Sequence, residues 1–205
     1  MLMGRHLVTF DKAVESGLKN DILDCLLYAQ LRADSMYPKT QAGWVWLEEY
    51  QRSITATGGR QFGRVVRNVL RIHGLRDLSR RPAFLDVADS PSLRHLLMTS
   101  FDTLMSSDLA RAYFNSWGSS GRSRQFQVVP CEVDANGKVN ILVCGLQMRT
   151  VALRPSLYFW EVLSGEMTVH YSGTVFRFNP EAYEPLRSMV QEALSREAKQ
   201  AVIQL

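Results

Sequence analysis

The β-rich part of this chain begins with the stretch QFQVVPCEVDANGKVNILVCGL, residues 125–146. Apolar residues recur with a period of two on both sides of Asn136-Gly137, a dipeptide that favours a tight type I′ turn. A turn signal between two β-rich runs is typical of two antiparallel strands. The stretch therefore predicts a β-hairpin.

The same hairpin predicts where two cysteines lie. If Ala135 pairs with Lys138 across the turn, Cys131 and Cys144 become diagonal neighbours on one face of the sheet. That face is expected to be buried, where cysteine commonly acts as a small hydrophobic residue; a redox pair is the alternative. With Cys25 the chain has three cysteines, none at zinc-finger spacing. A disulfide framework, a metal site and a cofactor are not expected.

The chain beyond the hairpin continues in a β-rich pattern and ends in a helix. Residues 156–163 and 167–178 predict two or three further strands. Residues 179–203 carry an apolar stripe wide enough to cover one face of a sheet. The stripe comprises Leu186, Met189, Val190, Ala193, Leu194, Ala201 and Val202. This half of the chain predicts an antiparallel β-meander covered by a C-terminal helix.

The chain before the hairpin reads mostly as helices. The expected helices span residues 20–37, 39–54, 60–73 and 90–105, and a shorter piece at 107–117 completes the set. The helix at 90–105 has the clearest start, with Ser90 at the N-cap and Pro91 at the first helical position.

The segment GSSGRSR, residues 118–124, is small and polar and is typical of a linker. The sequence thus predicts an α+β protein with a helical region at 1–117, a linker at 118–124, and a sheet with a C-terminal helix at 125–205. The two parts form either separate units or one continuous domain.

A second stretch, GGRQFGRVVRNVLRIHGL at residues 58–75, is the main functional candidate. On a helix of residues 60–73, valines and leucines gather on one side and four arginines gather on the other. These are Arg60, Arg64, Arg67 and Arg71, and no acid lies three or four residues from any of them. The pattern predicts an amphipathic helix whose arginine ridge binds a polyanion, with Arg76, Arg80 and Arg81 extending the basic region. The alternative is a solvated face, or one paired with acids elsewhere in the fold or in a partner subunit.

The bulk composition fits a globular protein that carries excess positive charge. The 205 residues have a formal net charge of +4, and 24 basic residues include 19 arginines by direct count. Arginine suits bidentate contacts with phosphate or carboxylate. The alternative is a GC-rich coding sequence, which raises the arginine content regardless of function. The sequence shows no signal peptide and no apolar run of about 20 residues. A cytoplasmic location is expected, or an intracellular or virion location if the protein is viral.

Two short fragments resemble segments of rhabdovirus matrix proteins. They are LRHLLMTSFDTL, Leu93–Leu104, and GLQMRTVA, Gly145–Ala152. The resemblance implies a small, basic, non-enzymatic α+β protein that bridges a membrane and a nucleocapsid by self-association. The proline-rich PPxY-type stretch of many such proteins is missing from this sequence.

No catalytic motif is recognisable, and no residue is singled out as catalytic. The function expected from the sequence is a non-catalytic interaction or assembly protein whose arginine-rich segment binds nucleic acid, an anionic membrane surface or an acidic partner. Association of the β-rich half with itself or with a partner is part of this expectation. The alternatives are a matrix-like viral structural protein, and an enzyme whose catalytic groups meet only in space. An exposed apolar patch or an unpaired sheet edge favours assembly, whereas a deep polar pocket favours an enzyme.

Overall fold

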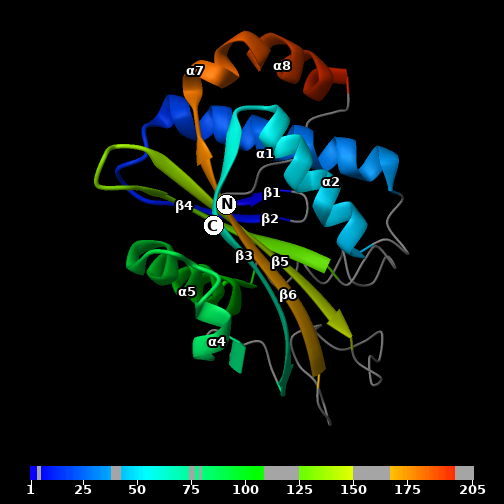
Figure 1. The fold of residues 1–205 in the computed structure, drawn as a ribbon, viewed down its shortest axis with the longest axis vertical. Coiled ribbons are helices and arrows are strands. Elements are labelled where there is room, and N and C mark those ends of the chain that lie inside the picture. Colours follow the sequence, from blue (N-terminus) through cyan, green and yellow to red (C-terminus); the bar gives the residue numbers. More distant parts are fainter. Residues whose placement is uncertain are drawn as a thin grey trace.

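A computed structural model describes residues 1–3, 6–37, 43–73, 77–78, 80–108, 125–149 and 167–196 of the chain. Four predictions lie outside these residues: the linker at 118–124, the strand at 156–163, Arg76, and the short helical piece at 107–117 from residue 109 on. The described residues form an α+β fold with helices on both faces of a central sheet (Figure 1).

The described strands form one mixed sheet. They are β1 (Leu2–Met3), β2 (His6–Phe10), β3 (Gly59–Ile72), β4 (Gln125–Val133), β5 (Val139–Arg149) and β6 (Met167–Phe178), in the spatial order β1-β2-β4-β5-β6-β3. Strands β4, β5 and β6 form the antiparallel meander that the sequence predicts. The expectation of a purely antiparallel sheet is wrong, because β2 pairs with β4 in parallel. Strands from the N-terminal part of the chain thus lie on both sides of the meander.

The helices divide between the two faces of the sheet. They are α1 (Ser16–Met36), α2 (Gly43–Ala56), α4 (Pro82–Leu85), α5 (Pro91–Ser106), α7 (Pro180–Tyr183) and α8 (Arg187–Arg196), with a 3₁₀ turn at Glu184–Leu186. Helices α1, α2 and α8 lie on one side, and α4 and α5 lie on the other (Figure 1). The predicted N-terminal helices and C-terminal helix are confirmed, except for the helix at 60–73.

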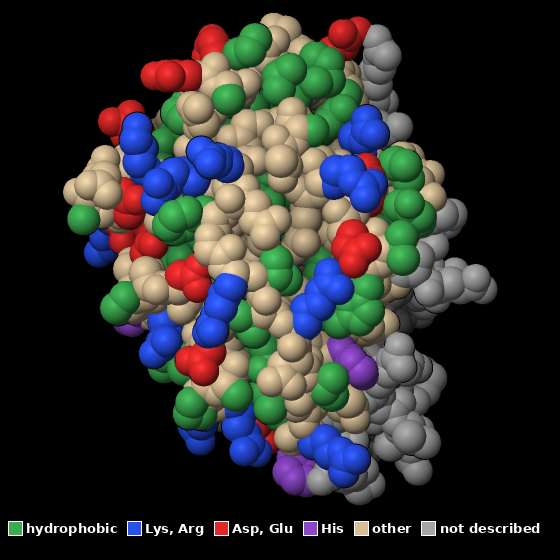
Figure 2. Space-filling model, in the orientation of Figure 1, with side chains coloured by type: hydrophobic (Ala, Val, Ile, Leu, Met, Phe, Trp, Pro, Cys, Tyr) green, Lys and Arg blue, Asp and Glu red, His purple; other side chains and the backbone are tan. Residues whose placement is uncertain are grey.

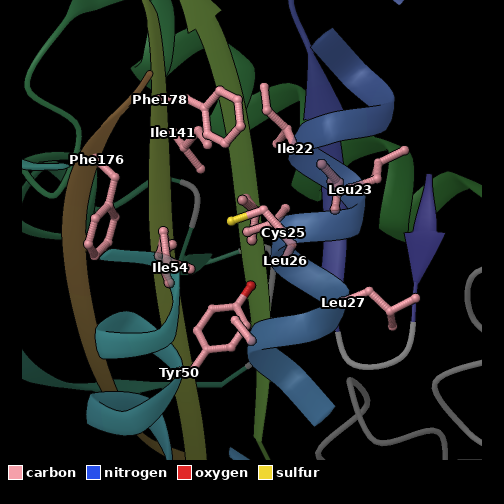
Figure 3. Close-up of a cluster of buried hydrophobic side chains, with 14 of the residues drawn as sticks. Ile22, Leu23, Cys25, Leu26, Leu27, Tyr50, Ile54, Ile141, Phe176 and Phe178 are labelled. Atoms are coloured by element: carbon pink, nitrogen blue, oxygen red, sulfur yellow. The ribbon is translucent and has the colours of Figure 1, made fainter. Parts of the chain in front are cut away.

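Two hydrophobic clusters fill the space between the sheet and these helix layers. The α1–α2 core combines apolar residues of α1 and α2 with Ile141, Phe176 and Phe178 of the sheet (Figure 3). The α5 core combines Leu93, Leu97, Phe101 and Leu104 with the opposite side of the sheet. Because strand side chains alternate between faces, each central strand contributes to both cores.

Helix α5 begins and packs as its sequence predicts. The Ser90 side chain accepts a hydrogen bond from the Leu93 N–H at 2.9 Å, and Pro91 occupies the first turn. The Ser90 hydroxyl also donates to the buried carboxylate of Glu132 at 2.6 Å. The N-cap therefore ties α5 to β4 as well as starting the helix.

The hairpin between β4 and β5 has a different turn from the predicted one. Val133 pairs with Val139, which leaves five residues, Asp134 to Lys138, in the connection. Gly137 lies in the left-handed region at φ 72°. The Asp134 carboxylate accepts hydrogen bonds from the N–H groups of Asn136 and Lys138, each at 2.9 Å. The Asp134 N–H donates to the Lys138 carbonyl at 2.8 Å, which leaves a loop of three residues, 135–137. A type I turn followed by a left-handed glycine is the usual form of a three-residue loop.

This turn shifts the predicted register by one residue and moves the two cysteines apart. Cys131 pairs with Ile141 and lies in the α1–α2 core, whereas Cys144 pairs with Val128 and lies in the α5 core. A one-residue shift turns each side chain to the other face. The expectation that Cys131 and Cys144 share a face is therefore wrong.

The turn makes stability depend on the charge of Asp134. The hydrogen bond from the Lys138 N–H, with smaller effects of the Asn136 N–H and the Arg177 guanidinium, lowers the pKa of Asp134. A carboxylate with a lowered pKa in the folded state contributes stability above its unfolded pKa and loses it as the pH falls. Asp134→Ala is expected to be less stable than the wild type at neutral pH, with a difference that narrows between about pH 5 and pH 2. Urea unfolding of both proteins across this pH range measures the difference in stability. A difference that does not change with pH would contradict a role for the Asp134 charge in stability.

Candidate interaction surface

The arginine-rich segment is a strand and not a helix. Residues Gly59–Ile72 form β3, which pairs antiparallel with β6 from Gly59 opposite Phe178 to Ile72 opposite Met167. The helical spacing of its arginines is real in the sequence. However, Val65, Val66, Val69 and Ile72 are β-branched and fit a pleated strand. Pairing with β6 decides between the two patterns, so the prediction of a helix at 60–73 is wrong.

As a strand, β3 divides its arginines between the two faces of the sheet. Arg67 lies on the α2 face, where its guanidinium is 2.9 Å from the Glu48 carboxylate and 5.8 Å from the ring centroid of Trp44. Arg71, four residues on, shares this face by alternation. Arg60 lies opposite Arg177, on the other face. The predicted single ridge of four arginines does not form, although all four side chains are exposed.

Arg64 lies in a bulge that interrupts the pairing of β3 with β6. The register passes from Phe62 opposite Val175 to Val66 opposite Gly173, so β3 has extra residues between them. Gly63 in this bulge has φ 76°, and a Cβ added to it would lie 2.0 Å from the Asp89 Oδ2 atom. This φ favours glycine, and any other residue here would be strained and would have to displace the Asp89 side chain. The bulge leaves Val66–Ile72 as a regular stretch of the strand.

The remaining predicted residues lie near the end of β3. Arg80 and Arg81 are exposed and precede α4, with the Arg81 N–H donating to the Leu78 carbonyl at 3.1 Å. Arg76 lies outside the described residues. The predicted basic region therefore consists, where described, of β3 and the segment before α4.

Exposed apolar side chains alternate with these arginines. Phe62, Val65 and Val69 are 44%, 44% and 47% exposed, and they make up three of the seven large apolar residues that are exposed among the described ones. The Arg177 guanidinium lies 4.3 Å from the ring centroid of Phe62 and 3.1 Å from the Asp134 carboxylate. Figure 2 shows Lys and Arg side chains spread over this view of the molecule, with acidic side chains between them.

Strand β3 stands at an edge of the described sheet. Its pairing partner among the described residues is β6 alone, and the order places β3 last. An edge strand presents a row of backbone N–H and C=O groups to solvent and can pair with another chain. Charged side chains and a bulge are also the devices that keep such an edge from unwanted pairing. The surface defined by Arg60, Phe62, Arg64, Val65, Arg67, Val69 and Arg71 is called the β3 edge below.

Sequence reasoning found the arginines of the β3 edge and missed the acids around it. Glu48 beside Arg67 comes from α2, and Asp89 beside Gly63 comes from the segment before α5. These acids are distant in sequence from the arginines they approach. The content of β-branched residues in β3 is the signal that would have indicated a strand.

The cysteines lie away from this surface, inside the two cores. Burial raises the pKa of Cys25 to about 12, and burial also raises the pKa of Cys131 and Cys144. The Cys25 Sγ atom lies 2.9 Å from the Thr57 Oγ1 atom. Protonated, buried thiols of this kind pack as small hydrophobic groups and are poor nucleophiles.

The described part of the chain contains no group of three or more His, Cys, Asp or Glu side chains placed to hold a metal ion. Within the same residues, none of the helices has the length and apolar character needed to cross a membrane.

Comparison with known proteins yields a distant structural likeness. No protein-family model and no curated protein matches the sequence. Among solved structures, the chain is similar to one described as "Structure of the Evf virulence factor", at a TM-score of 0.46 and 10% sequence identity. The match covers 96% of this chain and 79% of that one. A likeness at this TM-score does not assign a family to the chain.

Proposed function

We propose that this protein is a non-catalytic interaction protein whose β3 edge binds an acidic partner protein. The observation that carries the proposal is an exposed edge strand of 14 residues on which arginines alternate with exposed apolar side chains. Arginine binds carboxylates through a planar, bidentate fork, and apolar contacts beside it add affinity. The edge thus combines charge, apolar area and backbone groups along one line.

The charge distribution favours a protein over nucleic acid as the partner. A nucleic acid presents a regular row of phosphates and is best matched by a continuous basic surface. Here Glu48 and Asp89 lie among the arginines, and the arginines divide between two faces. A polypeptide can place carboxylates opposite the arginines and uncharged residues opposite the acids.

Binding measurements with charge-reversal variants test this proposal. The probes are a fluorescein-labelled poly-glutamate peptide, single-stranded DNA and phosphatidylserine vesicles, each measured from about 50 to 200 mM salt. Wild type is expected to bind the peptide with salt-dependent affinity. Arg64→Glu combined with Arg71→Glu is expected to weaken binding by at least about tenfold, since several contacts with a charged partner are lost.

The control variant changes net charge by the same amount at another place. Lys12→Glu with Lys138→Glu alters two exposed side chains, before α1 and in the hairpin turn. This variant is expected to bind poly-glutamate with an affinity close to that of the wild type. If both variants lost the same affinity for poly-glutamate, binding would depend on net charge alone, and the proposal would be overturned. Binding to DNA or vesicles without binding to the peptide would also overturn it, in favour of a nucleic acid or membrane partner.

A further inference from the structure

Arg60 and Arg64 are the arginines of the β3 edge that the fold leaves to solvent. Both side chains are exposed. Within the part of the chain that the structure describes, neither guanidinium has a hydrogen bond, an ion pair or a ring contact. Arg67 and Arg71, by contrast, are engaged within the chain, Arg67 with Glu48. Contact with a partner therefore breaks no internal interaction of Arg60 or Arg64.

The sheet places an exposed aromatic ring beside Arg60. Arg60 and Phe62 lie on the regular part of β3 before the bulge, opposite Arg177 and Val175 of β6. Residues two apart on a strand share a face and lie about 7 Å from each other. The Phe62 side chain is 44% exposed, and the Arg177 guanidinium lies over its ring at 4.3 Å from the centroid. Arg177 thus covers one side of the ring, and the exposed part is open to a partner.

Arg177 is held in place by a polar network that crosses the sheet. Its guanidinium lies 3.1 Å from the Asp134 carboxylate and donates to the Asn140 Oδ1 atom at 3.4 Å. Asn140 donates in turn to the buried Glu132 carboxylate at 3.2 Å, which also accepts from the Ser90 hydroxyl. The network fixes the guanidinium that covers the β3 ring. Little side-chain freedom is therefore lost when a partner contacts that ring.

The charges around the ring favour an anionic partner. Arg60 lies directly opposite Arg177, and like charges at such positions of two strands repel each other. The Asp134 carboxylate pairs with Arg177, whereas Arg60 has no acid of its own. A carboxylate from another protein would offset the charge of Arg60. Arginine and aromatic side chains are also the residues that contribute most to binding at protein interfaces.

The acids near the ring argue against a nucleic acid in this place. Asp89 lies beside the bulge, and Asp134 lies beside Arg177. A strand of regularly spaced phosphates cannot avoid these two carboxylates while it contacts both free arginines. A polypeptide can place carboxylates at the arginines and uncharged side chains next to the acids.

We infer that the partner is an acidic protein segment in which an aromatic side chain is flanked by carboxylates. The aromatic side chain packs on the open side of the Phe62 ring, and the carboxylates pair with Arg60 and Arg64. This inference rests on the proposed function. It names the part of the β3 edge that is contacted and the chemistry of the segment that contacts it.

Two fluorescein-labelled peptides with Ser-Gly flanks test the inference by anisotropy. The aromatic peptide has the core Glu-Glu-Trp-Glu-Glu, and the alanine peptide has Glu-Glu-Ala-Glu-Glu at the same net charge. Wild type is expected to bind the aromatic peptide at least about tenfold more tightly than the alanine peptide. The reason is that a tryptophan packed on an aromatic ring adds affinity that alanine lacks.

Phe62→Ala shows whether this preference comes from Phe62. The variant is expected to bind the two peptides with affinities within about twofold of each other, and to bind the alanine peptide as wild type does. Val69→Ala is the matched control, because Val69 is an apolar residue of β3 that is 47% exposed and lies on the other face. It is expected to keep the preference. Phe62→Leu retains apolar bulk without a ring, and about a threefold preference is expected if Phe62→Ala does not fold.

A second pair of variants tests the two arginines. Arg60→Gln with Arg64→Gln is expected to weaken both peptides by at least about tenfold, since two contacts with carboxylates are lost. Arg80→Gln with Arg81→Gln removes the same charge from two exposed residues before α4. This control is expected to bind both peptides within about twofold of wild type. Melting temperatures confirm that the variants are folded, and an equal loss in both pairs would overturn the inference.

The outcomes separate this inference from the proposed function. If wild type binds the two peptides equally, or if Phe62→Ala keeps the preference for the aromatic peptide, the inference is overturned while an acidic partner remains supported. Single-stranded DNA that binds more tightly than the aromatic peptide, and that Phe62→Ala weakens, would overturn both proposals in favour of base stacking on Phe62. If neither poly-glutamate nor either peptide binds, both proposals fail.

Discussion

Phe176→Ala is expected to lower the free energy of unfolding by about 3–5 kcal/mol. Phe176 of β6 is 1% exposed and lies in the α1–α2 core, where Figure 3 shows it in one cluster with Ile54 of α2 and Ile141 of β5. Removing its ring takes away buried apolar area and leaves a cavity between the sheet and α2 that neighbouring side chains only partly fill. Urea unfolding followed by circular dichroism measures the change.

A matched substitution on β3 shows that the effect comes from burial. Val69 is a strand residue with its side chain 47% exposed. Val69→Ala is expected to change the free energy of unfolding by less than about 0.5 kcal/mol. If Phe176→Ala cost no more than Val69→Ala, the placement of Phe176 in the core would be wrong.

Gly173→Ala is expected to destabilise the protein by about 1–3 kcal/mol through overpacking. Gly173 of β6 pairs with Cys144 of β5 and with Val66 of β3, so it lies between two strands. A Cβ added there would lie 2.4 Å from the Cβ and 3.2 Å from the Cα of Val87. Val87 is 1% exposed and belongs to the α5 core, so relief requires the backbone after α4 to move. Thermal and urea unfolding measure the loss.

Two further variants show whether Val87 causes this loss. Val87→Gly removes the clashing Cβ, and the double variant with Gly173→Ala is expected to be more stable than the sum of the single changes predicts, by about 0.5–3 kcal/mol. Gly17→Ala in α1 is the control, because a Cβ there meets nothing within 4 Å. It is expected to be neutral or stabilising, since alanine favours a helix over glycine. Strict additivity at Gly173 and Val87 would mean that the two residues are not in contact.

Local signals in the sequence predict the helices and strands whose caps, turns or apolar spacing are set by neighbouring residues. Helix α5 follows from Ser90, Pro91 and an apolar line at helical spacing, and each of these features is recognisable from neighbouring residues of the sequence. The β4–β5 hairpin follows from two alternating runs around a turn signal. The register of the two strands does not follow from these signals. Two turn geometries fit the same residues, and they give strand registers that differ by one residue. The α+β class follows from the order of such elements.

The presence of helices, a hairpin and an arginine-rich segment follows from the amino-acid sequence, because capping, periodicity and composition are properties of neighbouring residues. The strand conformation of Gly59–Ile72 depends instead on tertiary pairing. Its arginine spacing suits a helix and its valines suit a strand, and the hydrogen bonds that β6 offers favour the strand. Pairing with β6 also decides which way the arginines point. Alternate side chains of a strand point to opposite faces of the sheet, so Arg67 faces Glu48 and Arg60 faces the other side, whereas a helix would have placed both on one face.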